Sequence, residues 1–180
     1  MATGETVRNN FVHHSHGRGL WADTNHDGAI WDGNTVEDND WDGLVYEISY
    51  SATITNNVVN RNGAGNPSTY EGAGIAIHAS GGTGITVTGN TLSGNKNGII
   101  LIQASRGSGS LGSYTVQNVS VHDNTVTLGL TKIMVRFSTA ATPDSGQRST
   151  TTSLTTRTIC RQPTQRRSNG PPQGKPLQRR

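Results

Sequence analysis

The sequence is poor in several residue types, and each shortage excludes a class of protein. The chain of 180 residues contains a single cysteine, Cys160, so neither a disulfide framework nor a cysteine-based metal site is expected. It contains no run of about 18 apolar residues, so no membrane-spanning helix is expected, and its N-terminus lacks the apolar core of a signal peptide. Aromatic residues make up only 5% of the chain, whereas glycine occurs 23 times, which favours turn-rich β-structure over a large helical core.

The net charge of +3 combines two segments of opposite sign. Residues 1–135 contain six Lys or Arg and eleven Asp or Glu, a balance of −5. Residues 136–180 contain nine Lys or Arg and one acid, a balance of +8. A basic isoelectric point that comes from a terminal segment is poor evidence for nucleic-acid binding by the folded part, so no nucleic-acid partner is expected.

A repeated phrase organises residues 1–135. It consists of an alternating apolar segment, an asparagine, a second asparagine five residues later, a glycine and another apolar segment. The first asparagines of the five copies are spaced by 24, 23, 33 and 34 residues: Asn10, Asn34, Asn57, Asn90 and Asn124. A period in the low twenties with insertions predicts a solenoid, and the alternation predicts strands. The pattern resembles the right-handed parallel β-helix repeat, so we expect an all-β protein whose stacked asparagines hydrogen bond from coil to coil.

We predict that residues 1–135 form an incomplete single-stranded β-helix of about five coils. The chain opens inside a repeat without an evident cap, so we expect its natural start to be missing. The segment 131–137 has the alternation of one further strand. Residues 136–180 are rich in Thr, Ser, Arg and Pro and hold few apolar residues, which predicts a disordered basic tail and raises the hypothesis of a shifted reading frame.

The third strand of each coil follows a glycine, and aligning these glycines predicts one column of polar side chains. The four aligned glycines are Gly19, Gly43, Gly74 and Gly98. Because side chains alternate between the two faces of a strand, this register turns Leu44 and Tyr46 into the interior. It places Asp23, Glu47 and His78 on successive coils of an exposed outer face, with neighbouring Cβ atoms roughly 5 Å apart.

This column has the composition of an acid–base site. The two carboxylates, Asp23 and Glu47, are expected to split each other's pKa values, and their separation suits the acid and the nucleophile of a retaining glycosidase. His78 beside them is suited to act as a base or a proton shuttle. The three residues are therefore predicted to be catalytic, and the alternative is a solvated polar face without a role.

Two aromatic residues near the column are predicted to bind sugar. Trp21 faces outward beside Asp23 in this register, and an exposed indole can stack on a sugar ring; the alternative is packing under a loop. Tyr70 lies in an insertion at residues 63–73 that directly precedes the strand with His78. Insertions in solenoids project as loops, so we expect this one to overhang the column.

The turn that follows Asp23 offers oxygen ligands. Residues 23–28 match the opening of a calcium-binding EF-hand loop, but the closing glutamate is replaced by Asn34 and strands flank the turn. A weak calcium site at Asp23, Asn25 and Asp27 is therefore the one cofactor prediction, and a tight turn without a ligand is the alternative. Three neighbouring histidines have a spacing that is not diagnostic of zinc: His13, His14 and His16.

Two longer phrases resemble a bacterial, secreted subgroup of right-handed β-helix proteins in the pectate-lyase-like superfamily. They are Gly-Leu-Trp-Ala-Asp at 19–23 and Gly-Leu-Val-Tyr-Glu-Ile-Ser-Tyr at 43–50. The resemblance implies an extracellular location and a polysaccharide partner, and it places Asp23 and Glu47 on signature positions. The catalytic arginine and the calcium-binding aspartates of the lyases have no clear counterparts in this sequence.

We therefore expect a monomeric, polysaccharide-active β-helix protein that cleaves glycans at the column, either as a lyase or as a glycoside hydrolase. The alternative is a non-catalytic carbohydrate-binding or cell-surface structural β-helix. A fold of this kind serves both, because function resides in the site that a fold carries. The substrate, the type of cleavage and the use of metal are open at this point.

Overall fold

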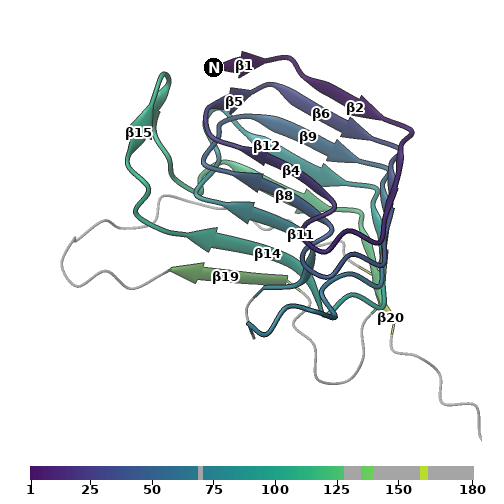
Figure 1. The fold of residues 1–180 in the computed structure, drawn as a ribbon. Coiled ribbons are helices and arrows are strands. Elements are labelled where there is room, and N and C mark those ends of the chain that lie inside the picture. Colours follow the sequence, from purple (N-terminus) through teal and green to yellow (C-terminus); the bar gives the residue numbers. More distant parts are fainter. Residues whose placement is uncertain (69–70, 128–134, 140–158, 162–180) are drawn as a thin grey trace, which may run out of the picture.

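A computed structural model describes residues 1–68, 71–127, 135–139 and 159–161. Five successive coils each contribute one strand to each of three parallel sheets, and the coils stack along one axis (Figure 1). The described residues form strands and turns, so the predicted all-β solenoid of about five coils is confirmed. In these residues no helix is long and apolar enough to cross a membrane.

Each sheet takes its strands from successive coils. Sheet I contains β2 (Thr6–Arg8), β6 (Ala29–Asp32), β9 (Ala52–Thr55), β12 (Ile85–Thr88) and β17 (Val119–His122). Sheet II contains β3 (Phe11–His13), β7 (Thr35–Glu37), β10 (Val58–Asn60), β13 (Thr91–Ser93), β18 (Thr125–Thr127) and β20 (Ile159–Arg161). Sheet III contains β4 (Leu20–Asp23), β8 (Leu44–Glu47), β11 (Ala73–His78), β14 (Asn97–Gln103) and β19 (Val135–Thr139). Two short pairings complete the set: β1 (Ala2–Thr3) with β5 (His26–Asp27), and β15 (Ser108–Gly109) with β16 (Gly112–Ser113).

Two strands fall in the region of the predicted tail, which begins at residue 136. Strand β19 spans its start, and strand β20 lies within it. β19 pairs with β14 in sheet III, and it overlaps the further strand that the sequence predicts at 131–137. β20 pairs with β18 in sheet II. The prediction of disorder for the other tail residues lies outside the described part of the chain.

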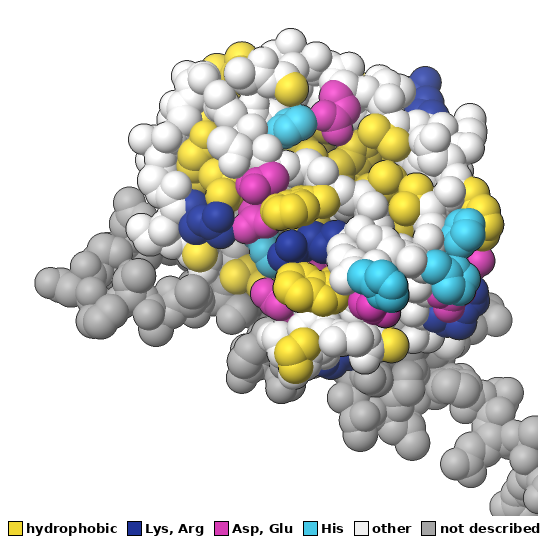
Figure 2. All heavy atoms as spheres, viewed as in Figure 1, with side chains coloured by type: hydrophobic (Ala, Val, Ile, Leu, Met, Phe, Trp, Pro, Cys, Tyr) yellow, Lys and Arg dark blue, Asp and Glu magenta, His cyan; other side chains and the backbone are white. Residues whose placement is uncertain are grey.

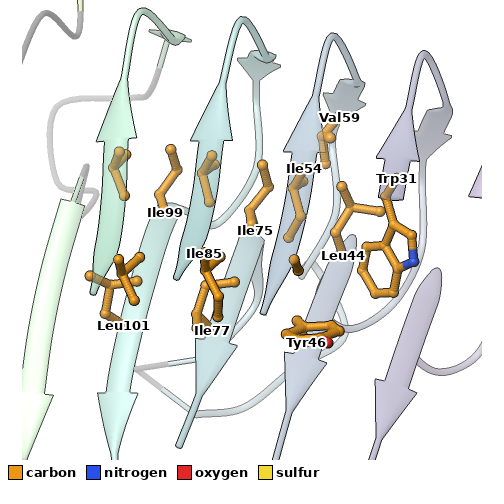
Figure 3. Packing of buried hydrophobic residues seen from close by; sticks show 14 of the residues in the cluster. Trp31, Leu44, Tyr46, Ile54, Val59, Ile75, Ile77, Ile85, Ile99 and Leu101 are labelled. Atoms are coloured by element: carbon orange, nitrogen blue, oxygen red, sulfur yellow. The ribbon is translucent and has the colours of Figure 1, made fainter. Parts of the chain in front are cut away.

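The interior of the solenoid is filled by alternate side chains from all three sheets (Figure 3). Seven of the eight inward positions that the repeat predicts for sheet III are buried, and Leu20 in the first coil is partly buried. The seven are Ala22, Leu44, Tyr46, Ile75, Ile77, Ile99 and Leu101. Trp31 of sheet I meets Tyr46 of sheet III edge to face, with ring centroids 5.8 Å apart. Each such side chain contributes about 1.5–3 kcal/mol of transfer free energy, so the core fixes the register of the coils.

Asparagine ladders close two of the three corners. The first ladder contains Asn10, Asn34, Asn57, Asn90 and Asn124, and the second contains Asn39, Asn62 and Asn95. At each step the side-chain Nδ2 donates to the Oδ1 of the next coil at 2.8–3.0 Å. The predicted hydrogen bonding between stacked asparagines is therefore confirmed.

The third corner, which follows sheet III, is built differently. Here the chain turns at Thr24, Ile48 and Ala79, whose φ angles are 68°, 48° and 44°. Left-handed backbone is costly for residues with a Cβ atom, and most of all for β-branched ones. At this corner a serine replaces asparagine in the hydrogen bond between coils: Ser80 Oγ accepts from the Ser49 backbone N–H at 2.9 Å. Backbone strain therefore lies directly beside the carboxyl ends of the sheet III strands.

Candidate functional site

The three predicted catalytic residues stand in one column at the carboxyl ends of three sheet III strands. Asp23 of β4 pairs in register with Glu47 of β8, and Glu47 pairs with His78 of β11. Ile102 of β14 continues the column on the next coil. The register predicted from the aligned glycines is therefore confirmed, and the strands hold the two carboxylates as direct neighbours.

The exposed column that the sequence predicts is exposed at only one of its three positions. Asp23 is exposed, but Glu47 and His78 are only 7% and 8% exposed. Residues 104–115, which we call the strap, contribute to this difference, because Arg106 contacts the Glu47 carboxylate. The strap leaves β14 after Gln103, includes the β15–β16 hairpin and runs back toward the first coil (Figure 1).

The strap crosses from the fourth coil to the first two. It contacts the solenoid at three points: Arg106 at Glu47, Ser110 at Asn25, and Leu111 with Gly112 at Tyr50. The ring centroids of Tyr50 and Tyr114 are also only 5.4 Å apart. This segment, and not the insertion at 63–73, therefore walls the column.

The carboxylate of Glu47 is fully engaged. Its Oε1 accepts from Arg106 Nη1 at 2.8 Å, and its Oε2 accepts from Trp21 Nε1 at 3.2 Å. His78 Nδ1 lies 3.9 Å from Oε1, too far for a hydrogen bond but close enough for an electrostatic interaction. His78 and then Arg106 hold the pKa of Glu47 at about 2, although burial opposes them. Glu47 is therefore ionised at neutral pH, and His78 and Arg106, not Asp23, dominate its titration.

His78 is the buried end of the column. Its Nε2 is buried and has no hydrogen-bond partner among the described residues. A buried polar atom without a partner is uncommon in native proteins and calls for an explanation at this position. Its location beside a catalytic candidate makes a functional explanation reasonable.

A cation held between two indoles lies next to the column. The guanidinium carbon of Arg18 is 4.5 Å from the ring centroid of Trp21 and 5.3 Å from that of Trp41. Behind it, Arg18 Nε is 3.9 Å from Oδ2 of Asp42, whose pKa is raised by burial. Trp21 itself is 51% exposed, so its predicted outward orientation is confirmed, and its sugar-binding role remains a prediction. Figure 2 shows acidic, basic, histidine and hydrophobic side chains gathered on this face of the molecule.

Sequence reasoning missed three charged residues at this site. Arg18 and Asp42 directly precede the aligned glycines Gly19 and Gly43, so the repeat alignment already held the signal that they are neighbours. Arg106 lies in an insertion, and its contact with Glu47 joins residues 59 apart, so no repeat position predicts it.

The insertion at 63–73 contacts the opposite ends of the strands. Lys96, which directly precedes β14, donates to the Ser68 carbonyl oxygen at 2.7 Å, and the Gly65 backbone N–H donates to the Asp40 carbonyl oxygen at 3.0 Å. The prediction that this insertion overhangs the column is therefore wrong for its described residues. Tyr70, the predicted second sugar-binding residue, lies outside them.

The turn predicted to bind calcium uses its side chains in protein contacts. Asn25 Nδ2 donates to Ser110 Oγ at 2.9 Å, and Asp27 Oδ1 accepts from the Ser51 backbone N–H at 3.1 Å. Asp23 Oδ1 accepts from its neighbour Thr24. Within the described ranges no three His, Cys, Asp or Glu side chains are grouped to hold a metal ion. A calcium site at Asp23, Asn25 and Asp27 remains a prediction.

Comparison with known proteins identifies the repeat. The family model described as right handed beta helix region matches residues 2–126, which include the column and the strap. No curated protein and no solved structure matches the chain. The family match covers more than half of the 180 residues, and it agrees with the stacked parallel sheets.

Proposed function

Because the chain belongs to the right-handed β-helix family, we propose that it is a polysaccharide-active protein that binds a glycan along sheet III and cleaves it at the column. One observation carries this proposal: Asp23 and Glu47 pair in register beside the exposed indole of Trp21. An indole next to two carboxylates offers a stacking platform for a sugar ring and two groups for acid–base chemistry.

The column divides the chemical roles by environment. Glu47 is ionised at neutral pH, which suits a nucleophile or a stabiliser of an oxocarbenium-like transition state. Asp23 is exposed and has access to the leaving-group oxygen, so it takes the part of acid and base. His78 assists by relaying a proton. Two neighbouring carboxylates favour hydrolysis over elimination, although a lyase with His78 as base is the alternative chemistry.

The test is a screen of the full chain against neutral and acidic polysaccharides, with and without calcium. We follow new reducing ends together with the absorbance of unsaturated uronates. Reducing ends alone indicate hydrolysis, and both signals together indicate a lyase. Calcium-dependent turnover that Asp27→Asn abolishes would support the predicted metal site.

Variants then connect the activity to the column. Glu47→Gln and Asp23→Asn each lower turnover by at least about 100-fold while glycan binding persists, because each removes a reacting group. Trp21→Ala instead weakens binding. Thr53→Ala, on an exposed position of sheet I, is the matched control and leaves both unchanged. Turnover that survives both carboxylate variants would disprove the assignment.

A second function is favoured by the ion pair at Glu47. Both oxygens of this carboxylate already have partners, as in a structural ion pair, so the face can serve to bind carbohydrate without cleaving it. In this case Trp21→Ala abolishes glycan binding, Glu47→Gln does not, and no reducing ends appear. We also propose an extracellular location and a monomer; sedimentation of the purified chain tests the latter.

A further inference from the structure

The proposed cleavage requires a carboxylate that a glycan can reach, but the Glu47 carboxylate is inaccessible in this structure. A nucleophile has to approach the anomeric carbon, but Glu47 is only 7% exposed and both of its oxygens are engaged. His78 is equally hidden. The segment that carries Arg106 onto Glu47 is the strap, so the strap controls whether the column is accessible.

We propose that the strap is a lid that holds the column closed and swings away before a glycan reaches Glu47 and His78. This inference rests on the proposed function, because it assigns a regulation to the same site. Lids and loops of this kind commonly gate catalytic sites.

The tip of the strap is held by solvent-accessible contacts, whereas Tyr114 near its end packs against the buried Tyr50. Both hydrogen bonds between Ser110 and Asn25, at 2.9 and 3.2 Å, are exposed. Leu111 at the tip of the hairpin is 54% exposed. Exposed hydrogen bonds contribute little net free energy, because water replaces them when they break. The tip of the strap can therefore separate from the first coil at a small cost in free energy.

The strap also contains two glycines that permit bending and a third glycine that packs against tyrosine side chains. Gly107 and Gly112 have φ angles of 80° and 111°, and nothing lies within 4 Å of the position of a Cβ atom at either residue. Gly109 is different, because a Cβ atom there would lie 2.0 Å from Tyr114 Oη and 2.7 Å from Tyr50 Oη. The two outer glycines permit movement, and Gly109 fits the strap against the tyrosines.

The closed state carries a cost that opening relieves. His78 Nε2 is buried without a partner among the described residues, and such an atom costs about 1–3 kcal/mol. Once the strap has moved, water or a glycan hydroxyl group can bond to this nitrogen. Opening also separates Arg106 from Glu47, which removes one of the two groups that hold the pKa of Glu47 low. The carboxylate is then free to react.

The test is a covalent lock between the strap and the first coil. Asn25→Cys and Ser110→Cys are introduced together with Cys160→Ser, and a short bis-maleimide joins the two new thiols. The matched control is the same protein capped with N-ethylmaleimide, which modifies both thiols without joining them. The readout is carbethoxylation of His78 by diethyl pyrocarbonate, followed by peptide mass spectrometry, together with glycan turnover.

We expect the crosslinked protein to show modification of His78 and glycan turnover at least tenfold slower than the capped control. Gly109→Ala, which displaces the strap from the tyrosines, is expected to accelerate modification of His78 at least threefold in the unlocked protein. Equal modification of His78 in the locked and the capped protein would overturn the lid. Protection of His78 by the lock without any glycan turnover in the control would support the lid and refute the proposed cleavage.

Discussion

Asn57 illustrates how single residues hold this solenoid together. Its amide is fully buried; Oδ1 accepts from the backbone N–H and the Nδ2 of Asn34, and Nδ2 donates to Asn90 Oδ1 and to the Trp31 carbonyl. One side chain therefore bridges three successive coils. Buried amides that are satisfied in this way are stabilising, whereas their removal leaves several unpaired groups at once.

We expect Asn57→Ala to lower the free energy of unfolding by on the order of 3 kcal/mol, because donors and acceptors on both neighbouring coils lose their partner in the interior. Urea denaturation followed by circular dichroism measures this change. Thr53→Ala, an exposed change on the adjacent strand, is the control and stays within about 0.5 kcal/mol. A loss for Asn57→Ala as small as that of the control would mean that the ladder is not structurally important.

The lowered pKa of Glu47 predicts a dependence of stability on pH. Its pKa is about 2 in the folded protein, below the ordinary value of 4.5, so the unfolded chain binds more protons between these values. The stabilising contribution of Glu47 is therefore complete above about pH 4.5 and is lost as the pH falls toward 2.

Glu47→Gln should accordingly lose less stability than the wild type when the pH is lowered from 7 to 3. Denaturant midpoints at the two pH values measure this difference. Thr53→Ala, an exposed and uncharged change on sheet I, is the control and keeps the wild-type dependence. If Glu47→Gln shows the full wild-type loss, the carboxylate of Glu47 is not stabilised by His78 and Arg106.

At the scale of the element, the strands were predictable, whereas the contacts of the strap were not. Local alternation and the aligned glycines specify which side chains share a face, so the neighbours of Glu47 along sheet III follow from sequence alone. Arg106 reaches Glu47 through an insertion that obeys no repeat, and such a tertiary contact leaves no periodic signal. The burial of Glu47 and His78 was missed for the same reason.

Left-handed backbone occurs at all three corners, but the third corner places it on β-branched residues, and Thr24 allows the resulting strain to be measured. This residue is exposed and has a φ angle of 68°, which a β-branched residue adopts only at a cost. We expect Thr24→Gly to be about 1 kcal/mol more stable than Thr24→Ala, because only glycine adopts this conformation freely. Thermal unfolding of the two variants measures the difference. Equal stability would show that the corner carries no strain.

At the scale of the whole molecule, the three sheets stack each coil only on its neighbours, so stability is distributed mainly along one axis, and the strap adds contacts from the fourth coil to the first two. The first coil has a neighbour on one side within the described residues, and its core residues Val7, Val12 and Leu20 are only partly buried. In the third coil, Ile54, Val59 and Ile75 are buried completely or almost completely.

Hydrogen exchange should therefore be graded along the solenoid. We expect backbone amides of β2 and β3 to exchange at least tenfold faster than those of β9 and β10, because the first coil opens without disturbing the others. Native-state exchange with peptide-resolved mass spectrometry measures the gradient. Uniform protection from β2 to β10 would instead indicate that the coils open together.

The asparagine ladders also give the solenoid a direction. In every step the Nδ2 of the earlier coil donates to the Oδ1 of the later one, so the amide dipoles add along the axis. Two copies that met with their first coils face to face would oppose like ends of this ladder. A coil added in the same orientation would continue it. The ladder thus gives the axis of the solenoid a polarity. A partner that stacks on the solenoid meets a different end of the amide dipoles at each end of the molecule.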